Sequence, residues 1–311
     1  MSNKTKRKNS NKLDNKNTNW LLAGLIVVGI LGASFLLAFL VSDLVPNGET
    51  TSDGSAQIIS VKGNLMLDNP TGLFSAGRGT STIIEEIRQA DQNDRVDAII
   101  LDIDSPGGTP VASHELAQAV KEAEKPTVAV IRESGASGAY WVASSADHII
   151  SNELSLTGSV GVLTTIVTVD GLLDDFNITY ERIVGGEYKD IASPLKEMQP
   201  DERNELQTKI DLMHDFFVDD VAQNRNLTEE QRAEVETGIF FIGLESIDVG
   251  LVDEFGSIRE AENYLSNVTG KEIESFRIQR RQGFFDSFAG VFQDLSPRTL
   301  LERDEHVAQL R

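Results

Sequence analysis

Two short apolar runs, each followed by a turn of small residues and then by a helical pattern, dominate the middle of the chain. The first run covers residues 96–103 and leads into the turn 104–108, and the second covers residues 126–131 and leads into the turn 132–137. Strands that alternate with helices in this way form mostly parallel sheets with right-handed crossovers. Binding sites in such sheets lie outside the carboxyl ends of the strands. The sequence therefore predicts an α/β fold with a mostly parallel sheet, in which the two turns line one crevice.

Hydrophobic periodicity places further elements on both sides of these runs. In residues 80–90, Ser81 or Thr82 is a candidate N-cap, and the isoleucines fall on one face of a helix. Residues 201–224 repeat apolar side chains every three or four positions, which is typical of a long amphipathic helix with a core or subunit contact along one face. Thr228 begins a capping box for another helix. We expect strands at 57–61, 96–103, 127–131 and 148–151, and helices at 80–90, 111–124, 138–146, 201–224 and 258–265.

The residue types that are missing exclude several kinds of site. The 311-residue chain has no cysteine, so disulfides, cysteine metal sites and thiol nucleophiles are excluded. It has four histidines and no HExxH motif, which disfavours a zinc protease. Outside residues 1–41 the net charge is −26, which repels phosphate backbones. We therefore expect no metal, no cofactor and no nucleic-acid partner.

An uncharged run of 22 residues, from Trp20 to Val41, follows a basic N-terminal tail at residues 1–19. At about 1.5 Å per residue, a helix of this length spans the hydrocarbon core of a bilayer. A cleaved signal peptide is the alternative, but its apolar region is shorter, and residues 42–47 show no Ala-x-Ala cleavage pattern. The sequence predicts an uncleaved transmembrane helix at 20–41, followed by a linker at 42–55.

Charges on the two sides of this run set its expected orientation. Residues 1–41 carry a net charge of +5, all of it before the run, whereas Asp43 and Glu49 follow it. Basic flanks stay on the cytoplasmic side of a membrane. The sequence therefore predicts a single-pass cell-membrane protein with a cytoplasmic N-terminus and an extracellular body at residues 56–275. Residues 276–311 form a C-terminal tail with a stripe of phenylalanines, for which we expect a contact with a neighbouring subunit or a site.

A serine at the junction between strand 127–131 and helix 138–146 is a candidate nucleophile. The free N–H groups at a helix start favour the negative charge that develops when a serine attacks a carbonyl group. Ser134 and Ser137 both lie in this turn, and both also suit an ordinary turn or cap. The glycines of the turn 104–108 have no side chain, so their N–H groups can approach a developing oxyanion closely.

A serine nucleophile needs a base, and the sequence offers two kinds. A Ser-His mechanism needs a histidine, but none lies between residues 149 and 213, and His148 is better explained as the start of a strand. A lysine serves as a base when burial lowers its pKa by several units and leaves it neutral. The candidates after the serine are Lys189, in a glycine-flanked loop, and Lys196, for which we expect greater exposure. Ser159 suits two roles, a hydroxyl partner for the lysine or an ordinary turn serine.

Four motifs in a fixed order carry a resemblance to a known family. They are Asp104-Ser-Pro-Gly-Gly, Ala136-Ser-Gly-Ala-Tyr-Trp141, Leu156-Thr-Gly-Ser-Val-Gly-Val162, and Tyr188-Lys-Asp with Ser193-Pro. Together with the segment 240–256 they resemble the signal peptide peptidase A (SppA) family in its short, single-domain bacterial form. The resemblance covers roughly residues 56–270 and the N-terminal anchor. One departure is Gly138-Ala-Tyr-Trp141, where the family often has Gly-Gly-Tyr-Tyr, a change that can alter the pocket.

This resemblance implies a ClpP/crotonase-like fold and a serine protease with a Ser-Lys dyad. It assigns Ser137 as the nucleophile, Lys189 as the base and Ser159 as the hydroxyl that holds the lysine. It assigns the N–H groups of Gly107 and Gly138 to the oxyanion hole. The substrates that it implies are the hydrophobic signal peptides that remain after signal peptidase has acted. The partners that it implies are further copies of the chain, commonly in an octamer, with each dyad built between neighbouring subunits.

The leading hypothesis is therefore a membrane-anchored extracytoplasmic serine endopeptidase. An acyl-CoA-processing enzyme of the crotonase type is a second hypothesis, because crotonases also use glycine-rich oxyanion holes. The acidic body and a location outside the membrane argue against it. A non-catalytic oligomeric scaffold, in which Ser137 and Lys189 are turn residues, is the third hypothesis.

Overall fold

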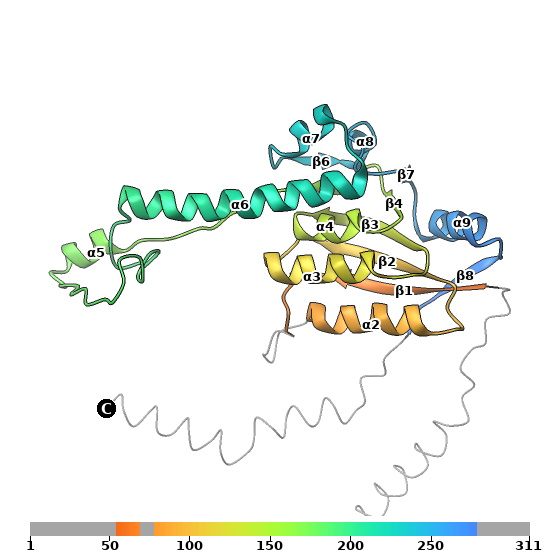
Figure 1. Cartoon of the computed structure of the whole chain (residues 1–311), viewed down its shortest axis with the longest axis horizontal. Coiled ribbons are helices and arrows are strands. Elements are labelled where there is room, and N and C mark those ends of the chain that lie inside the picture. The colour runs from red at the N-terminus through yellow and green to blue at the C-terminus, as the bar shows by residue number, and fades with distance from the viewer. Residues whose placement is uncertain (1–53, 69–77, 279–311) are drawn as a thin grey trace, which may run out of the picture. The chain divides into compact units, whose positions relative to one another are not determined.

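The structure is a computed structural model that describes residues 54–68 and 78–278 (Figure 1). The expected basic tail 1–19, the expected transmembrane helix 20–41 and the C-terminal residues 279–311 lie outside the described residues. Within the described ranges, no helix is long and apolar enough to cross a membrane. The membrane anchor therefore stays a prediction.

One sheet lies at the centre of the described chain. Its strands are β1 (Gly54–Lys62), β2 (Ala98–Ser105), β3 (Thr127–Ala136), β4 (His148–Ser151), β5 (Leu156–Gly158), β6 (Phe240–Ile242), β7 (Glu254–Phe255) and β8 (Ile273–Phe276). The strand order is β6-β5-β3-β2-β1-β8, and β4 pairs with both β3 and β7. Every pair is parallel except β5 with β6. The predicted α/β fold with a mostly parallel sheet is confirmed.

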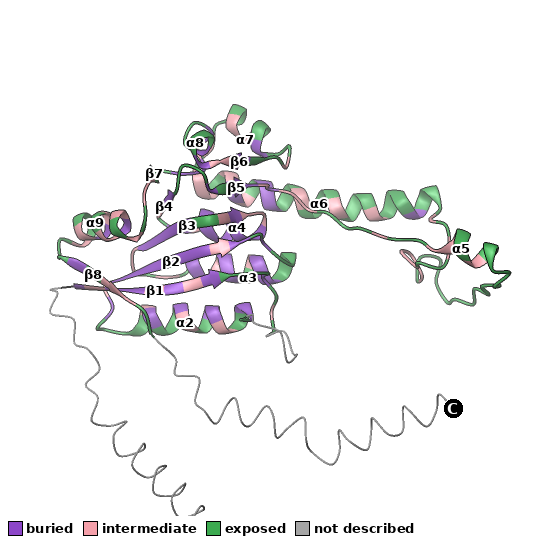
Figure 2. Cartoon of the chain, turned by 180° about the vertical axis from the view of Figure 1, so that it is seen from behind, coloured by how far each residue is buried: buried purple, intermediate pink, exposed green. Residues whose placement is uncertain are grey.

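Helices cover both faces of this sheet. The helices of the described chain are α2 (Thr80–Gln92), α3 (Pro110–Lys121), α4 (Gly138–Ser144), α5 (Asp170–Asp175), α6 (Pro200–Arg225), α7 (Glu229–Val235), α8 (Gly243–Ser246) and α9 (Ile258–Thr269), of which α5 lies away from the sheet. Side chains alternate between the faces of a strand, so β2 contributes to two cores. Leu101 and Ile103 belong to the larger core with α2, α3 and α4, whereas Ile100 packs in a smaller core with Leu265 of α9. Figure 2 shows α2 and α3 with buried residues facing the sheet and exposed residues facing away.

The two turns singled out in the sequence lie side by side. β2 and β3 pair in parallel, and their register brings Ser105 beside Gly135. β3 runs on to Ala136, beyond its predicted end at Ile131, because its second half pairs with β5. β5 has only three residues, and strands this short carry no periodic signal in the sequence.

The predicted cap of the first helix is wrong, although the helix itself is confirmed. The N-cap of α2 is Gly79, and no side chain bonds to the free N–H groups there. The hydroxyl of Ser81 donates instead to the Leu67 carbonyl oxygen, so this serine ties the helix start to the preceding loop. The capping box at Thr228 is confirmed, because its Oγ1 accepts from the Gln231 N–H at 3.2 Å.

Residues 163–213, which we call the arm, leave the sheet and return along α6 (Figure 1). Within the described chain, the hydrogen bonds and ion pairs of residues 163–199 join only residues between 163 and 203. The predicted apolar stripe of α6 is buried only toward its C-terminal end, at Phe217 and Val221. Large apolar side chains stay exposed along the arm, among them Leu163, Val167, Leu172, Phe176, Ile178, Ile183 and Leu212.

Candidate active site

Ser137 lies at the junction of β3 and α4 in a backbone conformation that is rare for a residue with a side chain. β3 ends at Ala136, α4 begins at Gly138, and Ser137 between them has φ of 52° and ψ of −129°. A non-glycine residue in such a region costs about 1–3 kcal/mol, and strain of this kind clusters at functional sites. The sequence placed the serine at this junction but gave no sign of its positive φ.

The hydrogen bonds of the turn distinguish its two serines. Ser134 Oγ donates to the Ser105 carbonyl oxygen at 3.3 Å, so Ser134 ties β3 to β2. Ser137 Oγ, in contrast, has no hydrogen-bond partner among the described residues, while its N–H donates to the Gly158 carbonyl oxygen at 2.8 Å. The backbone of Ser137 is held and its hydroxyl is free, which favours Ser137 as the nucleophile.

Two glycines allow the turns after β2 and β3 to approach each other closely. Gly107 has φ of +103°, and a Cβ added there would lie 2.8 Å from the Gly138 nitrogen and 2.9 Å from the Ser137 Cβ. A Cβ added to Gly138 would lie 2.0 Å from the Ser113 Oγ. Neither position has room for a side chain, so glycine is required at both for steric reasons.

The N–H groups of these two glycines differ in their bonding. The Gly107 N–H donates to Ser105 Oγ at 3.1 Å, and the same hydroxyl donates to the Gly63 carbonyl oxygen at 2.6 Å. The Gly138 N–H, at the first position of α4, has no acceptor within the described residues. An oxyanion beside Ser137 would therefore find one free donor, and a second donor that it would have to share with Ser105.

Ser159 lies close to the Ser137 turn. It directly follows Gly158, whose carbonyl oxygen accepts from the Ser137 N–H. Ser159 also has a positive φ, of 50°, and its own N–H donates to the Ile239 carbonyl oxygen at 2.9 Å. The structure thus brings Ser137, Gly138, Gly107 and the Ser159 segment together.

Lys189 lies on the arm and not beside Ser137. The C-terminal half of α6 is buried against the sheet at Phe217 and Val221, whereas α6 begins at Pro200, about 26 Å before Phe217 along the helix axis. Lys189 belongs to the far end, because Asp190 next to it is ion-paired to Lys196, and Lys196 to Glu202 in the first turn of α6. One copy of the chain therefore does not bring the two expected dyad residues together.

The expectation that Lys196 is the more exposed of the two candidate lysines is wrong. The Lys196 side chain is 17% exposed and forms ion pairs with Asp190 and Glu202, whereas Lys189 is exposed. Hydrogen bonding to Glu202 raises the pKa of Lys196. A lysine that is held in its charged form is a poor general base. Lys189 has no ion pair with any described residue, so it is the better candidate on grounds that the sequence did not supply.

Two histidines within the described residues, His114 and His148, pack against aromatic rings. His148 begins β4, as the sequence predicted, and its ring stacks on Tyr264 with 3.9 Å between centroids. The His114 ring lies 5.3 Å from Trp141 and 5.2 Å from Phe216. No group of carboxylates and histidines in the described ranges is arranged to hold a metal ion.

α4, the helix that follows Ser137, also contacts the C-terminal part of α6. Trp141 of α4 is 4% exposed, stacks on Phe217 with 4.3 Å between centroids, and donates from Nε1 to Asp220 at 2.6 Å. Tyr140 is fully buried, and its hydroxyl donates to the Leu251 carbonyl oxygen at 2.8 Å. Burial raises the pKa of Tyr140. Trp141, which departs from the resembled motif, therefore packs inside the molecule beside Tyr140 and contacts α6.

A pocket of about 510 Å³ lies at the carboxyl ends of the strands but does not include Ser137. Its lining mixes both signs of charge, with Lys62 and Arg132 beside Asp104 and Glu133. Nothing in this pocket resembles a nucleophile with a neighbouring oxyanion donor. The arrangement around Ser137 is the stronger candidate for chemistry.

Comparisons with known proteins identify the family of the chain. The family model described as peptidase family S49 matches residues 119–271, a range that holds Ser137, Ser159 and Lys189. A relative from Methanocaldococcus jannaschii, named "Putative protease MJ0651", is 31% identical over 276 residues, which cover 85% of this chain and 87% of the relative. A Synechocystis relative, named "Putative protease slr0021", is 32% identical over 67% of this chain and 75% of its own length. A relative from Enterococcus faecium, named "Putative signal peptide peptidase SppA", is 27% identical over 68% of this chain and 64% of its own length.

Proposed function

The chain belongs to peptidase family S49 and is a serine protease, and from this premise we propose that Ser137 and Lys189 form its catalytic dyad. The observation that carries the proposal is the conformation of Ser137. Its backbone is strained at a strand-to-helix turn, its hydroxyl is free, and two glycines that admit no side chain lie against it. A nucleophile that stands on a sharp turn, next to unpaired N–H groups, is suited to acyl transfer.

In the proposed reaction the neutral amine of Lys189 takes the proton of the Ser137 hydroxyl. The oxygen attacks the peptide carbonyl carbon and forms a tetrahedral intermediate with a negative oxygen. The C–N bond then breaks, the leaving amine takes a proton from the Lys189 ammonium, and an acyl-enzyme remains. Lys189 next takes a proton from a water molecule, whose oxygen attacks the ester carbon. The bond from that carbon to the Ser137 oxygen then breaks, the Lys189 ammonium returns its proton to the serine oxygen, and the carboxylic acid product leaves.

The N–H groups of Gly138 and Gly107 are the proposed oxyanion donors. The Gly138 N–H is unpaired, which suits it for this role. The Gly107 N–H must share its bond to Ser105 Oγ with the oxyanion or exchange it. Loss of one such donor typically costs about 3 kcal/mol of transition-state stabilisation.

The two halves of the dyad are proposed to come from different copies of the chain. Support comes from the distance of Lys189 from Ser137 within one copy and from the exposed apolar side chains of the arm, such as Phe176 and Ile183. Exposed apolar surface of this kind marks protein contacts. In the assembled homo-oligomer, for which we propose an octamer, Ser159 would accept a hydrogen bond from the incoming lysine.

Membrane attachment and substrate are further parts of the proposal. The uncharged run 20–41, with its basic flank, supports a single-pass anchor with the protease domain outside the cytoplasm. A protease held at a membrane surface meets hydrophobic peptides there. We therefore assign remnant signal peptides as substrates, in keeping with the name of the Enterococcus relative.

Mixing two inactive variants tests the proposal directly. Ser137→Ala and Lys189→Ala are each inactive in the proposal, and co-expression gives mixed assemblies. If the dyad is built between copies, some sites in these assemblies pair an intact Ser137 with an intact Lys189, and cleavage of a hydrophobic peptide returns. Activity in either single variant, or no recovery in verified mixed assemblies, contradicts the proposed dyad. Mixtures of Ser137→Ala with Ser137→Gly are the matched control, since they contain no intact serine.

The two other hypotheses predict different results. An acyl-CoA-processing enzyme would bind immobilised CoA, and family membership argues against it. A non-catalytic scaffold would leave a serine-reactive fluorophosphonate probe unbound in the unmodified protein. Labelling of Ser137 in the unmodified protein separates a protease from both.

A further inference from the structure

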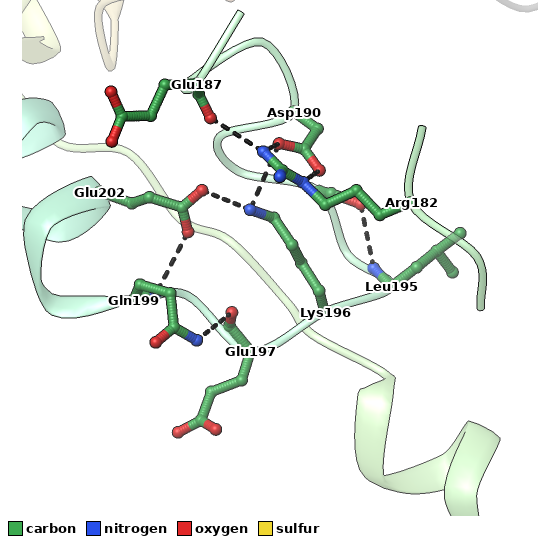
Figure 3. Close-up of polar contacts among 9 residues, drawn as sticks. Arg182, Glu187, Asp190, Leu195, Lys196, Glu197, Gln199 and Glu202 are labelled. Atoms are coloured by element: carbon green, nitrogen blue, oxygen red, sulfur yellow. Dashed lines mark hydrogen bonds and ion pairs between the residues drawn. The ribbon is translucent and has the colours of Figure 1, made fainter. Parts of the chain in front are cut away.

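Four charged side chains, Arg182, Asp190, Lys196 and Glu202, form a network that includes the residue directly after Lys189 in the sequence (Figure 3). Arg182 donates to both carboxylate oxygens of Asp190, with 2.6 Å from Nε to Oδ2 and 2.7 Å from Nη2 to Oδ1. Two-point pairing between a planar guanidinium and a carboxylate fixes orientation as well as distance. Asp190 is the next residue after Lys189, so its orientation bears on the direction of the lysine.

The charge network ties Asp190 to the start of a helix. Lys196 Nζ lies 3.4 Å from Asp190 Oδ1 and also bonds to Glu202 Oε1. Glu202 is buried, belongs to the first turn of α6, and accepts from the Gln199 N–H at 3.0 Å in a capping box. These contacts fix the position of Asp190 relative to the rigid end of α6, and not only relative to the loop.

The backbone around Lys189 is folded into consecutive turns. The Lys189 N–H donates to the Gly186 carbonyl oxygen at 3.3 Å, and the Ser193 N–H to the Asp190 carbonyl oxygen at 3.0 Å. Arg182 reinforces the first turn, because its Nη2 also donates to the Glu187 carbonyl oxygen at 2.8 Å. Arg182 therefore bonds to the loop on both sides of Lys189, at Glu187 and at Asp190.

Charge balance within the network leaves Lys189 without a carboxylate partner. Two cations face two anions, and hydrogen bonding to Arg182 lowers the pKa of Asp190 to about 2. The Asp190 carboxylate is 13% exposed and is occupied by Arg182 and Lys196. Both oxygens of the carboxylate that follows Lys189 in the sequence are therefore occupied by other side chains.

We propose that Asp190, fixed by Arg182 and Lys196, is a positioning residue that aims Lys189 at the serine of a neighbouring copy. The inference rests on the dyad proposed above. Asp190 touches neither the substrate nor the reacting atoms, and it acts through Lys189. Single ion pairs near the surface add little to folding stability, and we assign this network its main effect on geometry.

Substitutions in the full-length assembled protein test the positioning role. Asp190→Asn keeps the shape of the side chain and removes its charge, and Arg182→Lys keeps the charge and removes the two-point pairing. We expect each to lower kcat, by on the order of 100-fold for Asp190→Asn, with KM unchanged. Glu187→Gln is the matched control, because it removes one negative charge two residues before Lys189 and leaves the network intact. Its kcat stays at the level of the unmodified protein.

A double substitution distinguishes positioning from a general structural role. If Asp190 acts through Lys189, adding Asp190→Asn to Lys189→Ala causes no further loss in the rate of fluorophosphonate labelling of Ser137. An equal loss in both backgrounds overturns the inference. An unchanged kcat in both Asp190→Asn and Arg182→Lys, with Lys189→Ala inactive, also overturns it while the dyad stands. Full activity of Lys189→Ala refutes the dyad itself. Subunit assembly is checked by sedimentation for each variant, and Arg182→Lys carries the test if Asp190→Asn fails to assemble.

Discussion

The Ser137 turn and the Lys189 loop are built on different physical principles. Around Ser137 the backbone segments touch, and both Gly107 and Gly138 lack room for a Cβ. Around Lys189 the loop is open, a Cβ at Gly185 would meet nothing within 4 Å, and charged pairs hold the chain. Packing fixes the proposed nucleophile, and hydrogen-bonded charge holds the loop of the proposed base. The first region has almost no room for an added atom, whereas the second is held by charge pairs.

The largest expected effect tests whether the two regions form one site. Ser137→Ala and Lys189→Ala should each lower the rate of peptide cleavage by at least about 1,000-fold. The two residues act as one catalytic unit, so loss of either one removes most of the effect of both. Labelling by a fluorophosphonate probe should be lost in Ser137→Ala and slowed to a residual rate in Lys189→Ala. Equal labelling of the Lys189→Ala variant and the unmodified protein would show that the arm contributes nothing to serine activation.

A methyl group added at the Ser137 turn and one added on the arm should have unequal effects on activity and stability. In Gly138→Ala the new Cβ would lie 2.0 Å from the Ser113 Oγ. We expect activity to fall by on the order of 100-fold as the oxyanion donor is displaced, and stability to fall by about 1–3 kcal/mol. Gly171→Ala on the arm meets nothing within 4 Å and should leave the unfolding midpoint unchanged.

Relief of the clash sharpens that comparison. Combining Gly138→Ala with Ser113→Gly removes the atoms that the methyl group would meet, so part of the lost stability should return in thermal unfolding. Equal unfolding midpoints for Gly138→Ala and Gly171→Ala would contradict the tight packing inferred at the Ser137 turn.

Activity should rise toward alkaline pH, because only a neutral lysine accepts the serine proton. On the acidic side of its titration the neutral fraction falls about tenfold per pH unit. The measurement is kcat/KM for one peptide across pH, with a stability check at each point. An activity maximum below about pH 6 would contradict a lysine base.

The smallest expected effect is the opening of the arm at low pH. The pKa of Asp190 is lowered to about 2 by its hydrogen bonds with Arg182, below the ordinary value of about 3.9. Its ion pairs therefore stabilise the loop fully above about pH 4, and this stabilisation is lost as the pH falls toward 2. Amide hydrogen exchange should show residues 186–193 opening before residues 134–144 as the solution is acidified. Asp190→Asn should remove this difference in pH dependence.

The sequence predicted the elements with strong periodicity and missed features set by tertiary contact. Strand 148–151 and the start of α4 at Gly138 were predicted from local pattern alone. The two-residue strand β7 carries no period, so only its pairing with β4 reveals it. The positive φ of Ser137 is imposed by the neighbouring segment at Gly107, and a linear pattern does not record such an approach.

The residues of the candidate site were predicted unevenly for the same reason. Ser137 and Gly138 lie in one continuous motif, and the structure places them at one junction. The choice between Lys189 and Lys196 depends on which carboxylates surround each lysine, and those come from Asp190 and Glu202 after folding. Their placement relative to Ser137 in an assembly stays a prediction. The bond from the Gly107 N–H to Ser105 Oγ was also invisible in the sequence.

Because Trp141 of α4 stacks on Phe217 of α6, this contact is the point about which α6 can rotate. The same short helix begins at Ser137 and clasps α6 near its C-terminal end, while the far end of α6 lies about 26 Å away. A rotation of about 5° at this contact would swing the far end by about 2 Å. In the proposed assembly, the contact between α4 and α6 therefore links the turn that carries Ser137 to the direction in which the arm reaches toward a neighbouring copy.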